Sequence, residues 1–121
     1  MLEVPVVMIN FKTYNESSGK DAVLLGKDAV AVAKKTKQNV VCCVQAADIA
    51  TVAKTGIPTF AQHVDIALPG QGTGKVTIKA LKENGATGCL INHSENRISK
   101  KIIMQTLALL LDPALDLCGF N

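Results

Sequence analysis

The chain has 121 residues, 48% hydrophobic and 19% charged, which suits one globular domain and excludes a disordered chain. The net charge is +3, and the basic residues are scattered apart from Lys34, Lys35 and Lys37, so they fit a solvated helix end better than a nucleic-acid-binding surface. A signal peptide has basic residues before its apolar segment, whereas here the acidic Glu3 precedes the first apolar run. The longest apolar stretch, Ile102–Leu111, is too short to span a bilayer. We expect a cytoplasmic protein without membrane or nucleic-acid partners.

Four cysteines occur, with Cys42 and Cys43 adjacent and Cys89 and Cys118 isolated. This spacing matches neither a CxxC redox pair nor a set of zinc ligands. We therefore expect buried, reduced thiols, with no metal site and no cofactor.

Strands that are apolar along their whole length alternate with helices from the N-terminus onward. Val4–Asn10 predicts a first strand buried on both faces, and the helix after it starts at a capping-box-like pair, Ser18 and Asp21. Asn39–Gln45 predicts a second buried strand, followed by a short helix over Ala46–Lys54. These are two consecutive strand-helix units.

The third unit contains a long glycine-bearing loop. Thr59–Val64 predicts its strand, and a helix over Thr77–Asn84 has Thr77 as its N-cap and Gly85 just past its end. Between them, Asp65–Lys75 matches neither the P-loop spacing nor the G-x-G-x-x-G dinucleotide motif. We interpret it as a flexible or partner-contacting loop.

The fourth unit has a strand over Ala86–Ile91 and a helix that begins near Ser99 and is apolar on nearly every face until Pro113. Four units of this kind predict a parallel sheet with right-handed crossovers. The fold class is therefore α/β, and the pattern leaves open a small open sheet or half of an eight-stranded barrel.

Polar residues follow three of these strands: Asn10 and Lys12; Gln62 and His63; and Asn92, His93 and Glu95. The carboxyl ends of parallel strands point the same way, so these side chains should converge. Lys12 would offer a positive charge to an anionic substrate, with Asn10 as a neutral donor beside it. His93 precedes a helix whose dipole disfavours imidazolium, so a neutral ring could donate a hydrogen bond to a carbonyl oxygen.

Each of these residues also has a plainer interpretation. Lys12 could be a solvated lysine, His63 a packed or capping histidine, and Glu95 a structural carboxylate held by a basic side chain. The pairing of Lys12 and His93 at the ends of different strands favours the catalytic interpretation.

Four segments resemble the triosephosphate isomerase family, in particular its shorter archaeal members: Ile9–Tyr14 (INFKTY), Phe60–Asp65 (FAQHVD), Pro69–Lys75 (PGQGTGK) and Lys82–Arg97 (KENGATGCLINHSENR). The resemblance runs from Val4 to Arg97 in order, and N-x-K combined with NHSE is its specific feature. It implies the first half of a TIM barrel over residues 1–98, with four strands and three helices. The implied reaction, a step of glycolysis and gluconeogenesis, interconverts dihydroxyacetone phosphate and glyceraldehyde 3-phosphate through an enediolate.

The resemblance also implies roles for individual residues. Asn10 and Lys12 match the substrate-binding pair, and Glu95 matches an acidic residue that positions the lysine. His93 matches the family's electrophile, which is the standard example of a neutral catalytic histidine. The loop Asp65–Lys75 resembles one that reaches into a neighbouring subunit, so a homo-oligomer is implied.

The chain differs from the family after about residue 98, and the features of the second half of the family's barrel are not found in it. The family's catalytic glutamate on the sixth strand, its mobile lid and its phosphate-binding loops have no counterpart here, and residues 99–121 do not resemble the family's fourth helix and fifth strand. We favour a truncated or frameshifted tail over a genuine short protein, and expect the chain alone to be inactive.

Two other functions remain open at this point. One is a non-catalytic half-barrel that binds or assembles with another chain through its open strand edges. The other is a different phosphosugar-binding parallel α/β domain.

Overall fold

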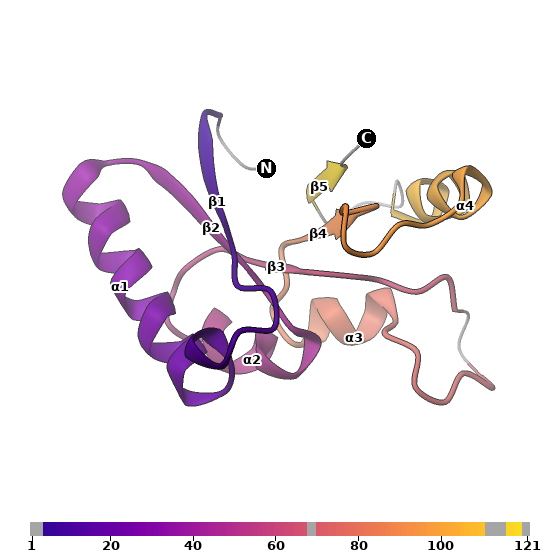
Figure 1. Cartoon of the computed structure of the whole chain (residues 1–121), viewed down its shortest axis with the longest axis horizontal. Helices are drawn as coiled ribbons and strands as arrows, with labels where there is room; N and C mark the ends of the chain where they lie inside the picture. Colours follow the sequence, from indigo (N-terminus) through magenta and orange to yellow (C-terminus); the bar gives the residue numbers. More distant parts are fainter. Residues whose placement is uncertain (1–3, 68–69, 111–115, 120–121) are drawn as a thin grey trace.

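The computed structural model describes residues 4–67, 70–110 and 116–119, which form a parallel sheet with flanking helices (Figure 1). The strands pair in chain order and are β1 (Val6–Asn10), β2 (Asn39–Val44), β3 (Thr59–Ala61), β4 (Gly88–Ile91) and β5 (Asp116–Gly119). The helices are α1 (Lys20–Thr36), α2 (Ile49–Ala53), α3 (Ile78–Glu83) and α4 (Lys100–Leu110), with 3-10 turns η1 (Asn15–Ser17) and η2 (Ala46–Asp48).

The predicted half-barrel of four parallel strands with helices is confirmed, and β5 adds a strand that the sequence did not predict. It pairs with β4 from Gly88–Asp116 to Ile91–Gly119. Residues 111–115 and 120–121 lie outside the described part of the chain, as does the predicted helix stop at Pro113.

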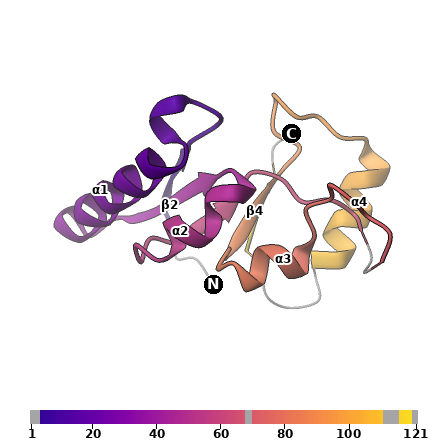
Figure 2. The ribbon, with the colours of Figure 1, turned by 90° about the horizontal axis from the view of Figure 1, so that it is seen from below.

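Two apolar layers lie on opposite faces of the sheet. The helix-covered layer combines buried residues of β2, β3 and β4 with residues of all four helices; Figure 2 shows these helices following one another along the sheet. The other layer is formed by Val41, Cys43, Phe60 and Leu90, with Val6 and Met8 packed against it. Successive residues of β2 face opposite layers, which explains why residues 40–44, which follow the exposed Asn39, are all apolar.

The ends of α3 follow the sequence signals closely. Thr77 Oγ1 accepts a hydrogen bond from the Ala80 amide, 3.3 Å away, as predicted for an N-cap. Gly85 has a φ of +91° just past the helix, and its amide donates to the Lys82 carbonyl while that of Ala86 donates to the Leu81 carbonyl. This Schellman motif turns the chain directly toward β4.

The predicted capping box of α1 was wrong. The residue before the helix is Gly19, which makes no side-chain cap, and the Ser18 hydroxyl donates back to the Tyr14 carbonyl. The Gly19 amide instead donates to the carboxylate of Asp48, which lies 29 positions away. The start of α1 is therefore held by a long-range contact and not by a local motif.

The expectation that β1 is buried on both faces was also wrong. Val7 is 51% exposed and Val4, just before the strand, is 82% exposed. β1 pairs only with β2 in the described sheet, so it is an edge strand there. The α4 helix likewise leaves Met104 58% exposed, although its Thr106 and Leu110 are buried.

The cysteine prediction is confirmed for three residues, because Cys42, Cys43 and Cys89 are buried thiols. The side chain of Cys118 lies outside the described part. Within the described residues, none of the helices has both the length and the apolar content that crossing a membrane requires.

Candidate active site

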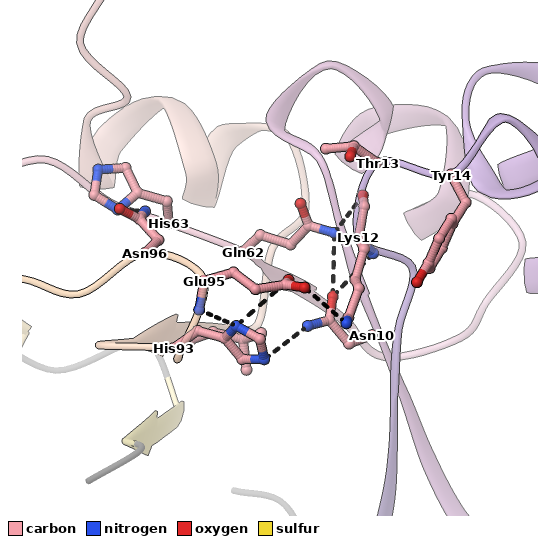
Figure 3. Close-up of a pocket in the computed structure, with 10 residues that line it drawn as sticks. Asn10, Lys12, Thr13, Tyr14, Gln62, His63, His93, Glu95 and Asn96 are labelled. Atoms are coloured by element: carbon pink, nitrogen blue, oxygen red, sulfur yellow. Dashed lines mark hydrogen bonds and ion pairs between the residues drawn. The ribbon is translucent and has the colours of Figure 1, made fainter.

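A cavity of about 450 Å³ opens where the loops after β1, β3 and β4 meet (Figure 3). Six of the seven residues singled out in the sequence line it: Asn10, Lys12, Gln62, His63, His93 and Glu95. The strand register explains this convergence, because β1 pairs with β2, β2 with β3 and β3 with β4 in parallel, so all three loops leave the same edge of the sheet.

Lys12 and Glu95 form an ion pair across the cavity, although they are 83 positions apart. The Lys12 Nζ atom donates to Glu95 Oε1 at 2.8 Å. The hydrogen bond and the charge of Glu95 raise the pKa of Lys12, and the same hydrogen bond lowers the pKa of Glu95. The lysine is therefore a fixed cation and the glutamate a weakly basic carboxylate.

His93 is oriented by a backbone amide. The Glu95 N–H donates to His93 Nδ1 at 3.2 Å, so Nδ1 carries no hydrogen and Nε2 carries the hydrogen of the neutral ring. Nδ1 also lies 3.7 Å from Glu95 Oε2, an ion pair that requires a protonated Nδ1 and would break the amide contact. The amide contact decides the tautomer, because it is shorter than the 3.4 Å approach of Asn10 Nδ2 to Nε2 and an amide N–H can only donate. With this tautomer Asn10 Nδ2 and His93 Nε2 are both donors, so they do not bond to each other and both are left to donate to a third group. His93 is then a neutral donor through Nε2.

Asn10 lies next to this donor. Its Nδ2 atom is 3.4 Å from His93 Nε2, and its Oδ1 atom accepts from the Lys12 amide at 3.0 Å. Gln62 lies behind Asn10 and donates to Asn10 Oδ1 at 3.3 Å. Two side-chain donors, from Asn10 and His93, therefore meet beside the lysine ammonium.

His63 lies at the margin of the cavity and is engaged by its neighbours. Its Nε2 atom is 3.3 Å from Asp65 Oδ1, and its Nδ1 atom is 3.3 Å from the side-chain amide of Asn96. These contacts favour the plainer interpretation of His63 as a packed histidine that joins the loops after β3 and β4.

Asp65 closes the base of the long loop. Its Oδ2 atom accepts from the Val76 amide at 2.8 Å, and the Asp65 amide donates to the Val76 carbonyl at 2.8 Å. Burial raises the pKa of Asp65, but hydrogen bonds from Val76, His63 and Lys75 together outweigh it, so the pKa lies below its ordinary value. Residues 68–69 of this loop lie outside the described chain.

Asn92 is the one predicted residue that does not line the cavity. It has a left-handed backbone, with φ +61°, and its Oδ1 atom accepts from the Ile98 amide at 3.1 Å. It closes the loop that carries His93 and Glu95. The cavity lining that sequence reasoning missed consists of Thr13, Tyr14, Leu90 and Asn96. Their only signal was position, since each lies within three residues of a predicted site residue.

The fold and cavity define a class of protein: a parallel βα half-barrel with polar residues gathered at the carboxyl ends of its strands. A family model described as triosephosphate isomerase matches residues 5–116. The chain belongs to the triosephosphate isomerase family.

Individual proteins that are similar to this chain support the same family assignment. The triosephosphate isomerase of Methanobacterium bryantii is 45% identical over 97 residues, which cover 79% of this chain and 43% of that protein. That of Methanobrevibacter smithii is 37% identical over 118 residues, or 97% and 53% of the two chains. The crystal structure of triosephosphate isomerase from Bartonella henselae matches with a TM-score of 0.76 and 24% identity over 95% of this chain and 50% of that one, which shows a shared fold.

The chain spans about half the length of the curated relatives it matches. The family match runs to residue 116, and the Methanobrevibacter alignment covers 97% of the chain. The likeness therefore continues past Arg97, where we expected it to stop.

Proposed function

We propose that this chain supplies the substrate-binding and electrophilic part of a triosephosphate isomerase site. The observation that carries the proposal is the meeting of three groups in one cavity: the ammonium of Lys12 and the side-chain donors of Asn10 and His93. The substrate would be dihydroxyacetone phosphate or glyceraldehyde 3-phosphate.

The chemistry assigned to each group follows from its hydrogen bonds. Lys12 attracts the anionic substrate and the negative charge that develops during enolisation, while Glu95 keeps the ammonium in place. His93 Nε2 and Asn10 Nδ2 donate to the substrate carbonyl oxygen, and these bonds strengthen as that oxygen becomes an oxyanion. A neutral ring suits this role, since it donates without first having to be charged.

The 121-residue chain on its own should bind and polarise the substrate without isomerising it. Enolisation needs a base next to the substrate carbon, and the one carboxylate lining the described cavity is Glu95. That carboxylate is bound to Lys12, and its pKa is lowered, so it is a poor base. We propose that the base comes from a segment outside these residues, in a closed barrel.

The test is a titration of the purified chain with dihydroxyacetone phosphate, followed by the amide signals of Lys12 and His93 in two-dimensional NMR. Dihydroxyacetone, which lacks the phosphate, is the control ligand, and Lys12→Met is the control variant. We expect binding by the wild type that falls at least tenfold with either control. Equal binding by Lys12→Met, or isomerase turnover by the chain alone, would contradict the proposal. Binding that depends on Lys12 and not on His93 would favour a different phosphosugar-binding protein.

A second candidate function is a half-barrel module that assembles with another chain. It is favoured by apolar side chains that are exposed on the edge strand β1, at Val7, and on the helix α4, at Ile102 and Met104. Assembly through the loop Asp65–Lys75, where Ile66 is 37% exposed, would give a homo-oligomer. Light scattering tests both routes, because a monodisperse monomer over a wide concentration range excludes assembly, and Ile66→Ser should dissociate only an oligomer formed through the loop.

A further inference from the structure

We propose that Gln62 is a positioning residue that directs the Asn10 donor into the cavity and holds the backbone of Lys12. The inference rests on the proposed function for its link to substrate binding, while its structural part can be measured without a ligand. The side chain of Gln62 lines the cavity, and Figure 3 shows it reaching toward Asn10 and Lys12.

The side-chain amide of Gln62 has only one possible orientation. Its Nε2 atom donates to the backbone carbonyls of Lys12, at 2.9 Å, and of Cys43, at 3.2 Å. Carbonyl oxygens only accept hydrogen bonds, so the nitrogen of the amide must face them. The same nitrogen lies 3.3 Å from Asn10 Oδ1, so two hydrogens serve three acceptors.

This orientation is passed on to Asn10. Its Oδ1 atom accepts from Gln62 Nε2 and from the Lys12 amide, and both of these groups can only donate. The Asn10 Nδ2 atom is thereby turned toward His93 Nε2, 3.4 Å away. Rotating the Asn10 amide by half a turn would let its oxygen accept from His93 Nε2, but it would set its nitrogen against two donors, Gln62 Nε2 and the Lys12 amide. Gln62 therefore opposes that rotamer.

Gln62 also acts on the conformation of Lys12. The lysine has a φ of +50°, in the left-handed region that side chains other than glycine rarely adopt. Its N–H is held by Asn10 Oδ1 and its carbonyl by Gln62 Nε2, so both flanking peptide groups are fixed. The Cys43 carbonyl, the third acceptor, also receives the Phe11 amide at 2.9 Å and anchors the arrangement to β2. Without Gln62, the lysine could relax out of this conformation.

The first test replaces Gln62 by methionine, which keeps the length of the side chain and removes its donors. Gln45→Met is the matched control, because Gln45 is also partly buried and loses one hydrogen bond, to Ser18 Oγ, outside the cavity. In Gln62→Met we expect the NMR chemical shifts of the two side-chain NH2 protons of Asn10 to move toward the values that they have in the unfolded chain. Affinity for dihydroxyacetone phosphate should fall about tenfold, the equivalent of one lost hydrogen bond of about 1.4 kcal/mol. Gln45→Met should change both by less than about twofold.

Gln62→Glu separates shape from hydrogen bonding. A glutamate fills the same space but cannot donate to Asn10 Oδ1 when ionised, so it should behave like Gln62→Met. If Gln62→Glu keeps the wild-type Asn10 signals and affinity, the donors are irrelevant and the inference is overturned. The wild-type chain supplies a measurement that needs no variant to fold: the NH2 protons of Gln62 should exchange with water at least tenfold more slowly than those of exposed Gln38. Equal exchange would also overturn the inference.

The outcomes distinguish this inference from the proposed function. If the wild type fails to bind dihydroxyacetone phosphate but Gln62→Met still releases Asn10, the proposed function fails and the positioning role stands. If the wild type binds and Gln62→Met changes neither Asn10 nor the affinity, the function stands and the positioning role fails.

Discussion

Replacing Gly85 by alanine should destabilise the chain in two separable ways. Gly85 has a φ of +91°, and a left-handed conformation costs an L-residue roughly 1–2 kcal/mol. In addition, an added Cβ atom would lie 3.0 Å from the Cβ atom of Ala53, so close that Ala53 would have to shift by a few tenths of an ångström. Overpacking of this kind costs roughly 1–3 kcal/mol, so we expect a total loss of about 2–5 kcal/mol.

Gly74 is the matched control for the backbone part. Its φ of +83° is similar, but a Cβ atom there would have no heavy atom within 4 Å. Gly74→Ala should therefore cost only the conformational share, about 1–2 kcal/mol. Urea unfolding followed by circular dichroism gives both free energies, and equal losses for Gly74→Ala and Gly85→Ala would refute the role of the Ala53 contact.

A double substitution checks the same contact from the other side. Ala53→Gly by itself should cost about 1 kcal/mol, because it ends α2 with a poor helix former. In combination with Gly85→Ala it removes the close approach of the two Cβ atoms. The double variant should therefore lose about 1–3 kcal/mol less free energy of unfolding than the two single variants lose in sum. Strict additivity would show that Ala53 does not resist the new side chain.

Three further predictions concern titratable groups. Glu95→Gln should lower the pKa of Lys12, measured by NMR titration of its side chain, because the hydrogen bond and charge that raise it are removed. Because the pKa of Asp65 is lowered in the folded chain, its ionised carboxylate stabilises the fold above the ordinary carboxyl pKa, and this stabilisation is lost as the pH falls through the lowered pKa. Asp65→Asn should therefore make the midpoint of urea unfolding depend less on pH in the acid range. Burial raises the pKa of Cys42 to about 11 and of Cys89 to about 12, so both thiols should resist alkylation at neutral pH until the chain is unfolded, and rapid labelling of the native protein would contradict their burial.

The sequence could predict features that depend on local chemistry. The N-cap at Thr77 and the turn at Gly85 were found because the residues involved lie within a few positions of one another. The meeting of Lys12 with His93 and Glu95 was also predictable, since parallel strands bring their carboxyl ends together whatever lies between them.

What the sequence could not predict depends on contacts made in space. The start of α1 at Gly19 is held by Asp48, and no local pattern shows that pair. The exposure of Val7 reflects the place of β1 at the sheet edge. An apolar sequence pattern does not distinguish an edge strand from a central one. Gln62 was placed near the site but was given no role, because its three acceptors come from Asn10, Lys12 and Cys43 on two other strands and their loops.

The most direct measurement of the central claim is the infrared spectrum of dihydroxyacetone phosphate bound to the chain. Donors on a carbonyl oxygen weaken the C=O bond, so if His93 Nε2 and Asn10 Nδ2 act as proposed, the carbonyl band of the bound ligand should shift to lower frequency than in water. The shift should shrink in His93→Ala and in Asn10→Ala and persist in the cavity-margin variant His63→Ala. A bound ligand whose carbonyl band stays at its position in water would contradict the account.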